Sequence, residues 1–398
     1  MTEKRFVVIT GRPGSGKSTL VSKLVRRLGE MGFKVAGVIT PELKDQKRYG
    51  FEVVGISSGK RKILALEKQR FNEQRLYGEL LRTKHTLGRY IVFPENFIEV
   101  IEIEMKNQAE VFVIDEVGPM EIPSGNIEKS WVDMVIRSDF GTTIATVKKN
   151  MAQSLRKFVG KNFFVDIDDF GFDSAYGVLL EITTGTDAFL FDLDGVIIDS
   201  SEFHMKAWMK YLSEKGINFS EHDFKMTFGK RNEEILREYF LNKSEEEIKK
   251  MSYEKEEIYR KLARGKLRPI EGSIEILKFL KEKGFRLALV SSTPKENIDF
   301  IFKELGLEGI FEAVISGSDI KAGKPNPECY LLAIDRLKVK PSRSYVVEDS
   351  EHGLEAGMKA GAKCIGITTT HKCLKNADIV IQNFKELKEF ISKIISLS

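Results

Sequence analysis

Two apolar runs, each followed at once by a tight turn of glycine and polar residues, constrain the fold of this chain more than any other feature. Phe6–Thr10 leads into the glycine-rich residues 11–18, and Leu20–Leu28 then has helical spacing. Further along, Ala188–Phe191 leads into Asp192-Leu193-Asp194-Gly195. Short apolar runs of this kind are typical of strands buried in a parallel sheet. The pattern occurs twice, so we predict an α/β protein with two separate sheets.

The remaining apolar runs extend both series and indicate the boundary between them. Thr183-Thr184-Gly185-Thr186-Asp187 is small and polar and is interpreted as a linker. We therefore expect one domain at residues 1–184 and another at 187–398. Within the second, charged amphipathic segments at about 204–268, such as Glu245–Leu262, predict an inserted α-helical cap. The other candidate strands are Lys34–Ile39 and Val111–Ile114 in the first series, and Leu287–Val290, Ala313–Ile315, Tyr345–Val347 and Cys364–Ile367 in the second.

Composition limits the partners and the compartment. The 398 residues carry a net charge of only +4, so no basic stripe for nucleic acid stands out. The three cysteines, Cys329, Cys364 and Cys373, have no metal-binding spacing and fit a reducing compartment without disulfides. No segment is typical of a signal peptide or apolar enough to span a membrane, so we expect a cytoplasmic protein. The high Lys and Glu content is typical of thermophiles.

The first turn has the pattern G-x-x-x-x-G-K-S/T between a strand and a helix. Its glycines let backbone N–H groups surround phosphate oxygens at the positive end of the following helix. Lys17 supplies a cation for the β- and γ-phosphates, and Ser18 supplies a hydroxyl for Mg²⁺. We predict a nucleotide-binding segment formed by Gly11, Arg12, Pro13, Gly14, Ser15, Gly16, Lys17, Ser18 and Thr19.

A second acidic signal follows the candidate strand Val111–Ile114. Asp115 is positioned at the strand end to hold Mg²⁺, and Glu116 to orient or deprotonate the attacking water. We therefore predict Asp115 as a metal residue and Glu116 as a catalytic residue of the same phosphate site.

Residues 5–150 resemble the small nucleoside-triphosphatase family first described from thermophiles, whose human relative is called cancer-related nucleoside triphosphatase. The resemblance implies hydrolysis of several NTPs to NDP and phosphate, with little selectivity for the base. The chain departs from the family near the end of the domain, where an Asn-Arg-Asp is often found; here stands Asp166–Asp173, which we interpret as a solvated loop. The matching stretches are the glycine-rich segment, Gly37–Glu42, Arg48–Phe51, Gly88–Tyr90 and Asp115–Glu121.

The second turn places an Asp-x-Asp-Gly directly after a strand. A carboxylate nucleophile such as Asp192 divides phosphomonoester hydrolysis into two easier displacements, and Asp194 can act as the acid and base for both. Ser291 follows a later strand and can donate to a phosphoryl oxygen, and Lys324 can neutralise its charge. The pair Glu348-Asp349 ends another strand and supplies Mg²⁺ ligands. In a parallel sheet these strand ends meet at one edge.

This order of residues resembles the haloacid dehalogenase superfamily, and within it the β-phosphoglucomutase and phosphatase branch, over residues 187–398. The resemblance implies that Asp192 is the nucleophile and Asp194 the general acid and base. It also implies that Asp192, the backbone carbonyl of Asp194 and Asp349 hold Mg²⁺, with Glu348 in support. The expected fold class is a P-loop NTPase domain of three α/β/α layers fused to a Rossmann-like haloacid dehalogenase core with an inserted α-helical cap.

The cap residues leave phosphatase and phosphomutase both open. His204 matches a histidine that β-phosphoglucomutase uses at the cap hinge. In Gly229-Lys230-Arg231-Asn232 the arginine that grips a second phosphate in the mutase is displaced by one position, to Arg231. Lys261 is a further candidate cap contact. Because a mutase must hold two phosphates, the displaced arginine favours a phosphatase.

Taken together, these patterns predict a bifunctional Mg²⁺-dependent phosphohydrolase with no organic cofactor. Its substrates would be an NTP, such as ATP or GTP, and a small phosphorylated metabolite, with a sugar phosphate favoured; neither nucleic acid nor membrane is an expected partner. Alternatives for the first domain are a small-molecule kinase, with Arg48 and Arg89 as lid arginines, or a nucleotide-binding regulatory module.

Overall fold

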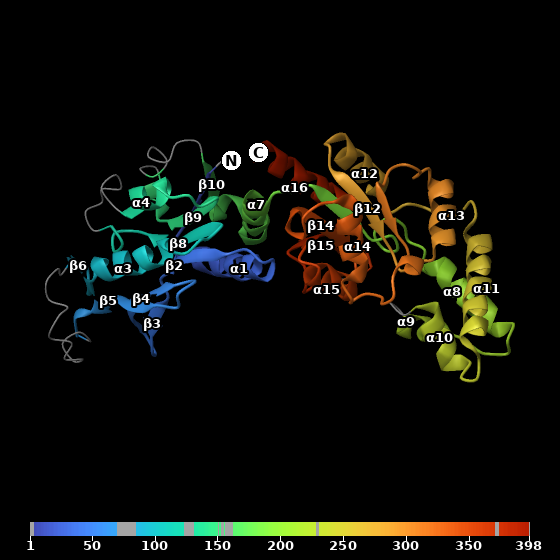
Figure 1. Cartoon of the computed structure of the whole chain (residues 1–398). Coiled ribbons are helices and arrows are strands. Elements are labelled where there is room, and N and C mark those ends of the chain that lie inside the picture. The colour runs from blue at the N-terminus through green and yellow to red at the C-terminus, as the bar shows by residue number, and fades with distance from the viewer. Residues whose placement is uncertain are drawn as a thin grey trace. The chain divides into compact units, whose positions relative to one another are not determined.

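The computed structural model describes residues 4–69, 85–122, 131–149, 151–152, 155, 162–227, 231–370 and 374–397. The chain divides into two compact units, Met1–Thr183 and Thr184–Ser396, which are described separately (Figure 1). Among the described residues, no helix combines the length and the apolar character needed to cross a bilayer.

One sheet of ten strands forms the centre of the N-terminal unit. Its order is β10-β1-β9-β8-β2-β4-β5-β7-β6, with β3 beside β4. The strands from β10 to β2 are parallel, whereas β2–β4, β4–β5, β5–β7 and β6–β7 pair in antiparallel fashion. The bounds are β1 Arg5–Thr10, β2 Val35–Ile39, β3 Glu42–Lys44, β4 Arg48–Gly55, β5 Arg61–Glu67, β6 His85–Leu87, β7 Tyr90–Val92, β8 Val111–Val117, β9 Thr142–Val147 and β10 Phe163–Asp166.

Helices cover both faces of this sheet because the strand residues alternate between two apolar cores. Val7 and Ile9 of β1 face a core that also contains the buried side of α1 (Lys17–Glu30) and α7 (Phe172–Thr184). Phe6 and Val8 face the opposite core, with α3 (Pro94–Met105) and α4 (Trp131–Arg137). This arrangement confirms the predicted α/β/α layers; the antiparallel extension β4–β7 was not predicted.

The C-terminal unit is built on a second, fully parallel sheet. Its order is β13-β12-β11-β14-β15-β16. Phe189 and Phe191 of β11 face one core, and Ala188 and Leu190 face the other. The bounds are β11 Ala188–Phe191, β12 Arg286–Val290, β13 Ala313–Ile315, β14 Ser344–Glu348, β15 Lys363–Ile367 and β16 Ile379–Ile381.

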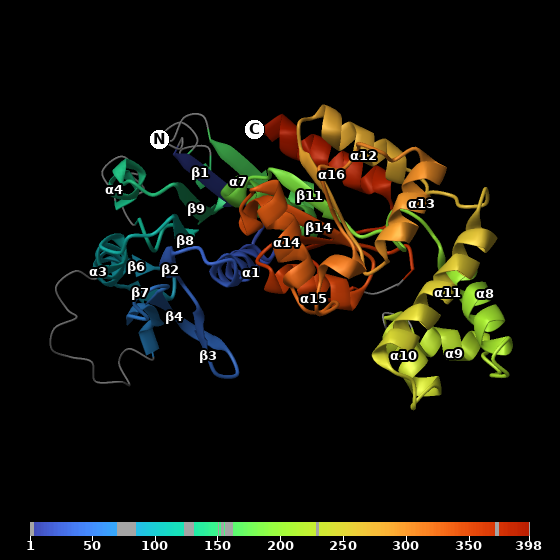
Figure 2. The same ribbon diagram turned by 45° about the vertical axis from the view of Figure 1, so that its right-hand side comes forward.

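The helices of this unit divide into those on the sheet and those of a cap (Figure 2). On the sheet, α12 (Ser273–Glu282), α13 (Lys295–Leu305) and α16 (Phe384–Leu397) contribute to one core, and α14 (Glu328–Leu337) and α15 (Glu351–Lys359) to the other. The cap consists of α8 (Ser201–Ser213), α9 (Glu221–Met226), α10 (Asn232–Tyr239) and α11 (Glu245–Ala263), which share a small core around Trp208 and Ile248. A Rossmann-like core with an inserted helical cap was predicted, and this is confirmed.

The segment interpreted as a linker is largely fixed against the C-terminal unit. Thr183 and Thr184 are the last residues of α7. The fully buried ammonium of Lys363 donates to the Gly185 carbonyl and to the Thr186 hydroxyl, both at 2.6 Å. Arg343 and Asp187 form a two-pronged ion pair at 2.5 and 2.7 Å. Residues 184–187 are therefore part of this unit's folded structure.

The interpretation of Asp166–Asp173 as a solvated loop is wrong. Asp166 ends β10 and caps the short helix α6 (Ile167–Phe170) by accepting from the backbone N–H of Asp168. The chain then turns at Gly171, with φ 74°, directly into α7. The side chains of Ile167 and Phe170 pack in the apolar core, which explains why the acidic run is ordered.

Candidate active sites

The glycine-rich segment connects β1 to α1. Gly14 and Gly16 have φ of 80° and 91°, a region that favours glycine. The Lys17 ammonium donates to the carbonyl oxygens of Gly11 and Arg12, both at 2.9 Å. Ser15 Oγ is buried and has no hydrogen-bond partner among the described residues. An unsatisfied hydroxyl inside such a loop fits an oxygen-rich anion.

Asp115 lies at the end of β8, beside the first turn of α1. Its Oδ1 accepts from Ser18 Oγ at 3.1 Å and from Thr146 Oγ1 at 2.7 Å. Thr40 Oγ1 donates to the Asp115 carbonyl at 2.8 Å. Burial raises the pKa of Asp115, although the two hydroxyl donors oppose this. The predicted metal residues Ser18 and Asp115 are therefore neighbours.

The carboxylate of Glu116 lies next to a cation and a second carboxyl group. Lys148 Nζ is 3.2 Å from Glu116 Oε1, and both side chains are partly exposed. Glu121 is buried, and burial together with the charge of Glu116 raises the pKa of Glu121 to about 8. Glu116 thus combines contact with solvent and a fixed orientation, as a residue that handles water requires.

Asp168 holds the start of the phosphate loop, a role that sequence reasoning missed. Its Oδ2 accepts from the backbone N–H of Arg12 at 2.9 Å, and its Oδ1 lies 3.4 Å from Arg12 Nε. The hydrogen bond to the Arg12 backbone, with the Arg12 side chain adding to it, lowers the pKa of Asp168. Asp168 could have been identified from the sequence as an acidic residue just after β10, the strand next to β1.

The arginines considered as lid residues are engaged elsewhere. Arg48 Nη1 contacts Glu42 Oε1 at 2.6 Å, and Arg89 Nε contacts Glu67 Oε1 at 3.1 Å. Both pairs belong to the antiparallel extension of the sheet. No contact in the described structure connects either arginine to the phosphate loop.

In the C-terminal unit, the ends of three strands and one loop bring together most of the predicted residues. Lys324 Nζ donates to Asp192 Oδ1 at 2.5 Å, to Glu348 Oε1 at 2.6 Å and to the carbonyl of Val290 at 3.2 Å. Burial lowers the pKa of Lys324, but Asp192 and Glu348 outweigh burial and the net shift is upward. The lysine is therefore a permanent cation in the pocket.

The pocket contains more buried negative charge than Lys324 offsets. Carboxylate oxygens of Asp192, Glu348 and Asp349 lie within 4.8 Å of one another. Burial raises the pKa of Asp192; Lys324 opposes the shift, and Glu348 and Asp349 reinforce it. A Cβ on Gly195 would lie 2.1 Å from Asp349 Oδ2, so this glycine is required for the close approach of the two loops.

Asp194 is oriented by two hydroxyl groups. Ser200 Oγ donates to its Oδ1, and Thr293 Oγ1 donates to its Oδ2 at 2.8 Å. Ser291, at the end of β12, is buried, and its Oγ accepts from the backbone N–H of Thr293 at 3.0 Å. The Ser291 O–H remains able to donate to a phosphoryl oxygen.

Tyr330 supports this cluster and was not predicted. The residue is fully buried on α14, and its hydroxyl donates to Glu348 Oε1 at 2.7 Å. The Lys324 ammonium lies 5.1 Å from the centre of its ring. Glu348 is thereby fixed from two sides, while Asp349 accepts from Thr370 Oγ1.

The cap contributes a buried polar cluster that includes one predicted residue, His204. Its ring stacks on Tyr259 with 4.0 Å between ring centres, and its Nδ1 lies 2.8 Å from Lys255 Nζ. Lys255 also contacts Glu256 Oε1 at 2.8 Å, with both side chains at most 4% exposed. Burial and the Lys255 ammonium lower the pKa of His204 to about 4, so the ring is a neutral acceptor at neutral pH.

The other two predicted cap residues, Arg231 and Lys261, are not part of this cluster. Arg231 extends toward the Rossmann-like core domain, where its Nη1 is 3.4 Å from the Lys321 carbonyl. It also forms an ion pair with Glu234 of the cap. Lys261 is exposed, and no contact in the described structure connects it to the site. The lysine buried in the cap is Lys255, which was not predicted, and a role for Lys261 stays a prediction. Gly229 and Lys230 lie outside the described residues.

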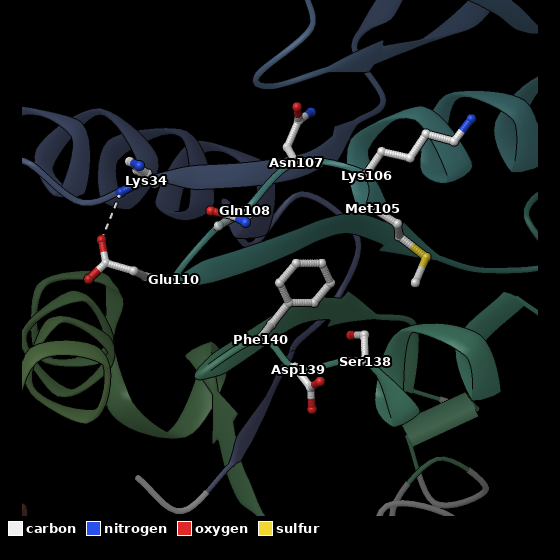
Figure 3. Close-up of a pocket in the computed structure, with 10 residues that line it drawn as sticks. Lys34, Met105, Lys106, Asn107, Gln108, Glu110, Ser138, Asp139 and Phe140 are labelled. Atoms are coloured by element: carbon white, nitrogen blue, oxygen red, sulfur yellow. Dashed lines mark hydrogen bonds between the residues drawn. The ribbon is translucent and has the colours of Figure 1, made fainter. Parts of the chain in front are cut away.

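A hollow of about 520 Å³ in the N-terminal unit lies apart from the phosphate loop of the same unit. Figure 3 shows its mixed lining, in which Met105 and Phe140 lie among polar side chains and Glu110 accepts from the backbone N–H of Lys34 at 3.1 Å. These residues precede β2 and β8, whereas the phosphate loop follows β1. The hollow is thus at the opposite edge of the sheet and contains none of the predicted site residues.

Each unit therefore has a polar site at the carboxyl edge of a parallel sheet, which defines a protein with two phosphate-handling domains. The NTPase family model matches residues 6–169, and the haloacid dehalogenase-like hydrolase family model matches residues 189–367.

Three curated relatives agree with this division. The nucleoside-triphosphatase THEP1 of Methanothermobacter thermautotrophicus is 40% identical over 38% of this chain and 80% of its own length. A phosphorylated carbohydrates phosphatase of Thermotoga maritima is 34% identical over 45% of this chain and 83% of its own. Beta-phosphoglucomutase of Bacillus subtilis is 31% identical over 50% and 91%. The chain belongs to the NTPase family in its N-terminal half and to the haloacid dehalogenase-like hydrolases in its C-terminal half, and is a fusion of two hydrolases.

Proposed function

We propose that residues 1–184 and 187–398 carry out two Mg²⁺-dependent phosphate-transfer reactions at separate sites. The first domain hydrolyses an NTP to NDP and phosphate, and the second removes phosphate from a small metabolite, with a sugar phosphate as the favoured substrate. The observation that supports this most is the convergence of Asp192, Lys324, Glu348 and Asp349 in one buried cluster of charged side chains. Relatives of both halves are named for these two kinds of substrate.

In the second domain the Asp192 carboxylate attacks the phosphorus of the phosphomonoester. An oxygen–phosphorus bond forms, the bond to the leaving oxygen breaks, and Asp194 protonates that oxygen. Asp194 then removes a proton from the water that hydrolyses the aspartyl-phosphate, which restores Asp192 and releases phosphate. Ser291 and Lys324 bind the phosphoryl oxygens during both steps. The hydroxyls of Ser200 and Thr293 hold Asp194 in one orientation.

The residues present fit Mg²⁺ in this domain. Three buried carboxylates face a single lysine, and oxygen donors are what this cation prefers. Asp192, the Asp194 carbonyl and Asp349 would hold it, with Glu348 in support. When bound, Mg²⁺ supplies positive charge that offsets the phosphoryl group and its carboxylate nucleophile.

In the first domain Glu116 accepts a proton from the water that attacks the γ-phosphorus, while the bond to the oxygen bridging the β- and γ-phosphates breaks. Lys17 binds the β- and γ-phosphates, and the backbone of residues 11–19 surrounds them. Ser18 Oγ and Asp115 Oδ1, 3.1 Å apart, fit a second Mg²⁺, which supplies positive charge to the phosphates when bound.

One observation in the cap favours phosphatase over phosphomutase. Asn232, the first residue of α10, donates to Glu256 Oε1 at 2.6 Å, and Asn297 of the core donates to Glu256 Oε2 at 2.5 Å. Burial raises the pKa of Glu256, but Lys255, His204 and Asn232 outweigh burial and lower it to about 2, so Glu256 stays an anion that neutralises Lys255. Because this buried lysine is already paired, it is not a free cation for a second phosphate in the cap.

The test uses p-nitrophenyl phosphate as the probe for the second domain. We expect Mg²⁺-dependent release of p-nitrophenol that EDTA abolishes, and the mass increase of one phosphoryl group on the peptide containing Asp192 after acid quenching. Asp192→Asn should lose both signals. Turnover without the mass increase, or turnover in the presence of EDTA, contradicts the mechanism.

One substrate, β-glucose 1-phosphate, distinguishes a phosphatase from a mutase. Incubation with β-glucose 1-phosphate should yield inorganic phosphate and no glucose 6-phosphate. Accumulation of glucose 6-phosphate would instead establish the mutase.

A further inference from the structure

The order of strands determines on which side of the phosphate loop a nucleoside must lie. The loop follows β1, which has β9 and then β8 on one side and β10 on the other. Asp115 and Glu116, which act at the γ-phosphate end in our proposal, belong to β8. A triphosphate laid across the loop with its γ end toward β8 directs its nucleoside toward β10. The residues after β10 are therefore the ones that face the base.

Phe172 is an aromatic side chain of this segment that adjoins the loop, on the side of Gly16, whereas Asp168 and Ile167 adjoin Arg12 and Gly11. The Cδ2 and Cε2 atoms of its ring lie 3.4 and 3.5 Å from the position that a Cβ on Gly16 would occupy. Gly16 is the N-cap of α1, so the ring lies beside the turn that begins the phosphate-binding helix. Gly171, with φ 74° and ψ 158°, directs the chain so that Phe172 begins α7 at this point. The ring is only partly buried.

Two acidic side chains of this segment, Asp166 and Asp168, are already engaged. Asp168 accepts from the Arg12 backbone, and Asp166 contacts Lys149 at 3.2 Å. The Lys23 ammonium lies 3.9 Å from the centre of the Tyr176 ring and 5.9 Å from that of Phe172. An aromatic ring can stack on every nucleobase where no side chain forms base-specific hydrogen bonds, because each base has a π-face.

We propose that Phe172 is the nucleobase platform of the NTPase site and that it holds any base by stacking, without selecting among bases. This inference rests on the proposed nucleotide site at residues 11–19. It explains how a chain with Asp166–Asp173 in place of the family's Asn-Arg-Asp binds nucleotides. The ligand class is any purine or pyrimidine nucleoside di- or triphosphate.

The test measures binding to the whole chain by calorimetry in the presence of Mg²⁺, so that turnover is not needed. The probes are ADP, GDP, CDP and UDP, together with inorganic pyrophosphate, which has no base. Phe172→Leu removes the ring and keeps an apolar side chain in the core; Phe172→Ala removes both. Phe33→Ala is the matched control, because Phe33 packs in the same core but precedes β2, at the opposite edge of the sheet.

Both Phe172 variants should weaken the Kd of all four nucleoside diphosphates about tenfold and leave that of pyrophosphate within about twofold. Phe33→Ala should leave all five constants unchanged. Equal weakening of pyrophosphate, unchanged nucleotide binding, or loss for one base only overturns the platform. Lys17→Ala should lose all five ligands; if it retains them, the proposed nucleotide site itself is wrong, whatever Phe172 does.

Discussion

The buried pair Lys255–Glu256 shows how strongly one side chain in the cap depends on another. Glu256 accepts from Lys255, Asn232 and Asn297, and Lys255 has a second contact with His204. Burial lowers the pKa of Lys255 although Glu256 opposes the shift, so the ammonium depends on its partner to stay charged.

Glu256→Gln should therefore lower the free energy of unfolding of the C-terminal domain by about 3 kcal/mol, because it leaves a buried ammonium without a counter-charge. Urea unfolding measures the change. Glu202→Gln is the control, since it removes an exposed ion pair with Lys206 on α8 and should change stability by less than about 0.5 kcal/mol. Equal effects of the two substitutions would contradict the assigned burial.

The lowered pKa of His204 predicts how the stability of the C-terminal domain depends on pH. Its pKa in the folded state, about 4, lies below the unfolded value of about 6.5, so the unfolded chain binds more protons between these values. Stability is therefore full above about pH 6.5 and falls as the pH is lowered toward 4. His204→Gln should remove this part of the slope when urea midpoints are measured from pH 7.5 to 4.5. The same slope in both proteins would show that His204 titrates normally.

Among the helices and strands, α3 is tied to β2 and to the turn after β4 by one buried carboxylate, that of Glu104. Glu104 is fully buried and accepts from the backbone N–H groups of Gly37, Ser57 and Ser58 and from the Ser57 hydroxyl, at 2.7 to 3.0 Å. Burial alone would raise the pKa of Glu104, but these hydrogen bonds outweigh burial and the net shift is downward. One residue thus connects α3, β2 and the turn between β4 and β5.

Glu104→Ala should destabilise the N-terminal domain by about 3 kcal/mol, because it leaves several buried donors unsatisfied. Glu99→Ala on the same helix, which removes an exposed pair with Lys62, should change stability by less than about 1 kcal/mol. Thermal unfolding of both variants provides the comparison. A loss for Glu99 as large as for Glu104 would contradict this account of α3.

The sequence was sufficient to predict most of the parallel strands, because each of these is a short apolar run next to its own turn; β9, β10 and β16 were not predicted. β1 with its glycine loop and β11 with Asp192 are local patterns of this kind. The antiparallel extension β4–β7 was missed, since its pairing joins segments with alternating burial and no motif. Segment Asp166–Phe172 was misread, because the packing that orders it involves residues distant in sequence.

Lys255 was not predicted from the sequence, although its position could have identified it. Glu245–Leu262 was predicted as a charged amphipathic helix, and the buried side of α11 includes Lys255 and Glu256 together with Ile248, Met251 and Tyr259. Helical spacing places Lys255 four residues after Met251 and four before Tyr259, on the apolar stripe. A charged residue on the apolar stripe is the sequence feature that could have identified Lys255. Lys261 lies off this stripe and is exposed.

For the whole chain, the contacts of residues 184–187 predict where the C-terminal domain can be cut. A fragment of residues 184–398 keeps the Gly185 and Thr186 acceptors of the buried Lys363, and a fragment of 187–398 lacks them. The shorter fragment should be less stable by about 3 kcal/mol, because a buried ammonium loses its acceptors. Urea unfolding of the two fragments measures this; equal stability would show that residues 184–187 are a free linker.

The central claim is that the chain has two independent phosphate-transfer sites. Its most direct test is Mg²⁺-dependent release of phosphate from ATP and of p-nitrophenol from p-nitrophenyl phosphate, in wild type, Lys17→Ala and Asp192→Asn. We predict that Lys17→Ala loses only the first activity and that Asp192→Asn loses only the second. If ATP hydrolysis survives Lys17→Ala but disappears in Asp192→Asn, the N-terminal domain is not an independent catalyst and the claim is contradicted.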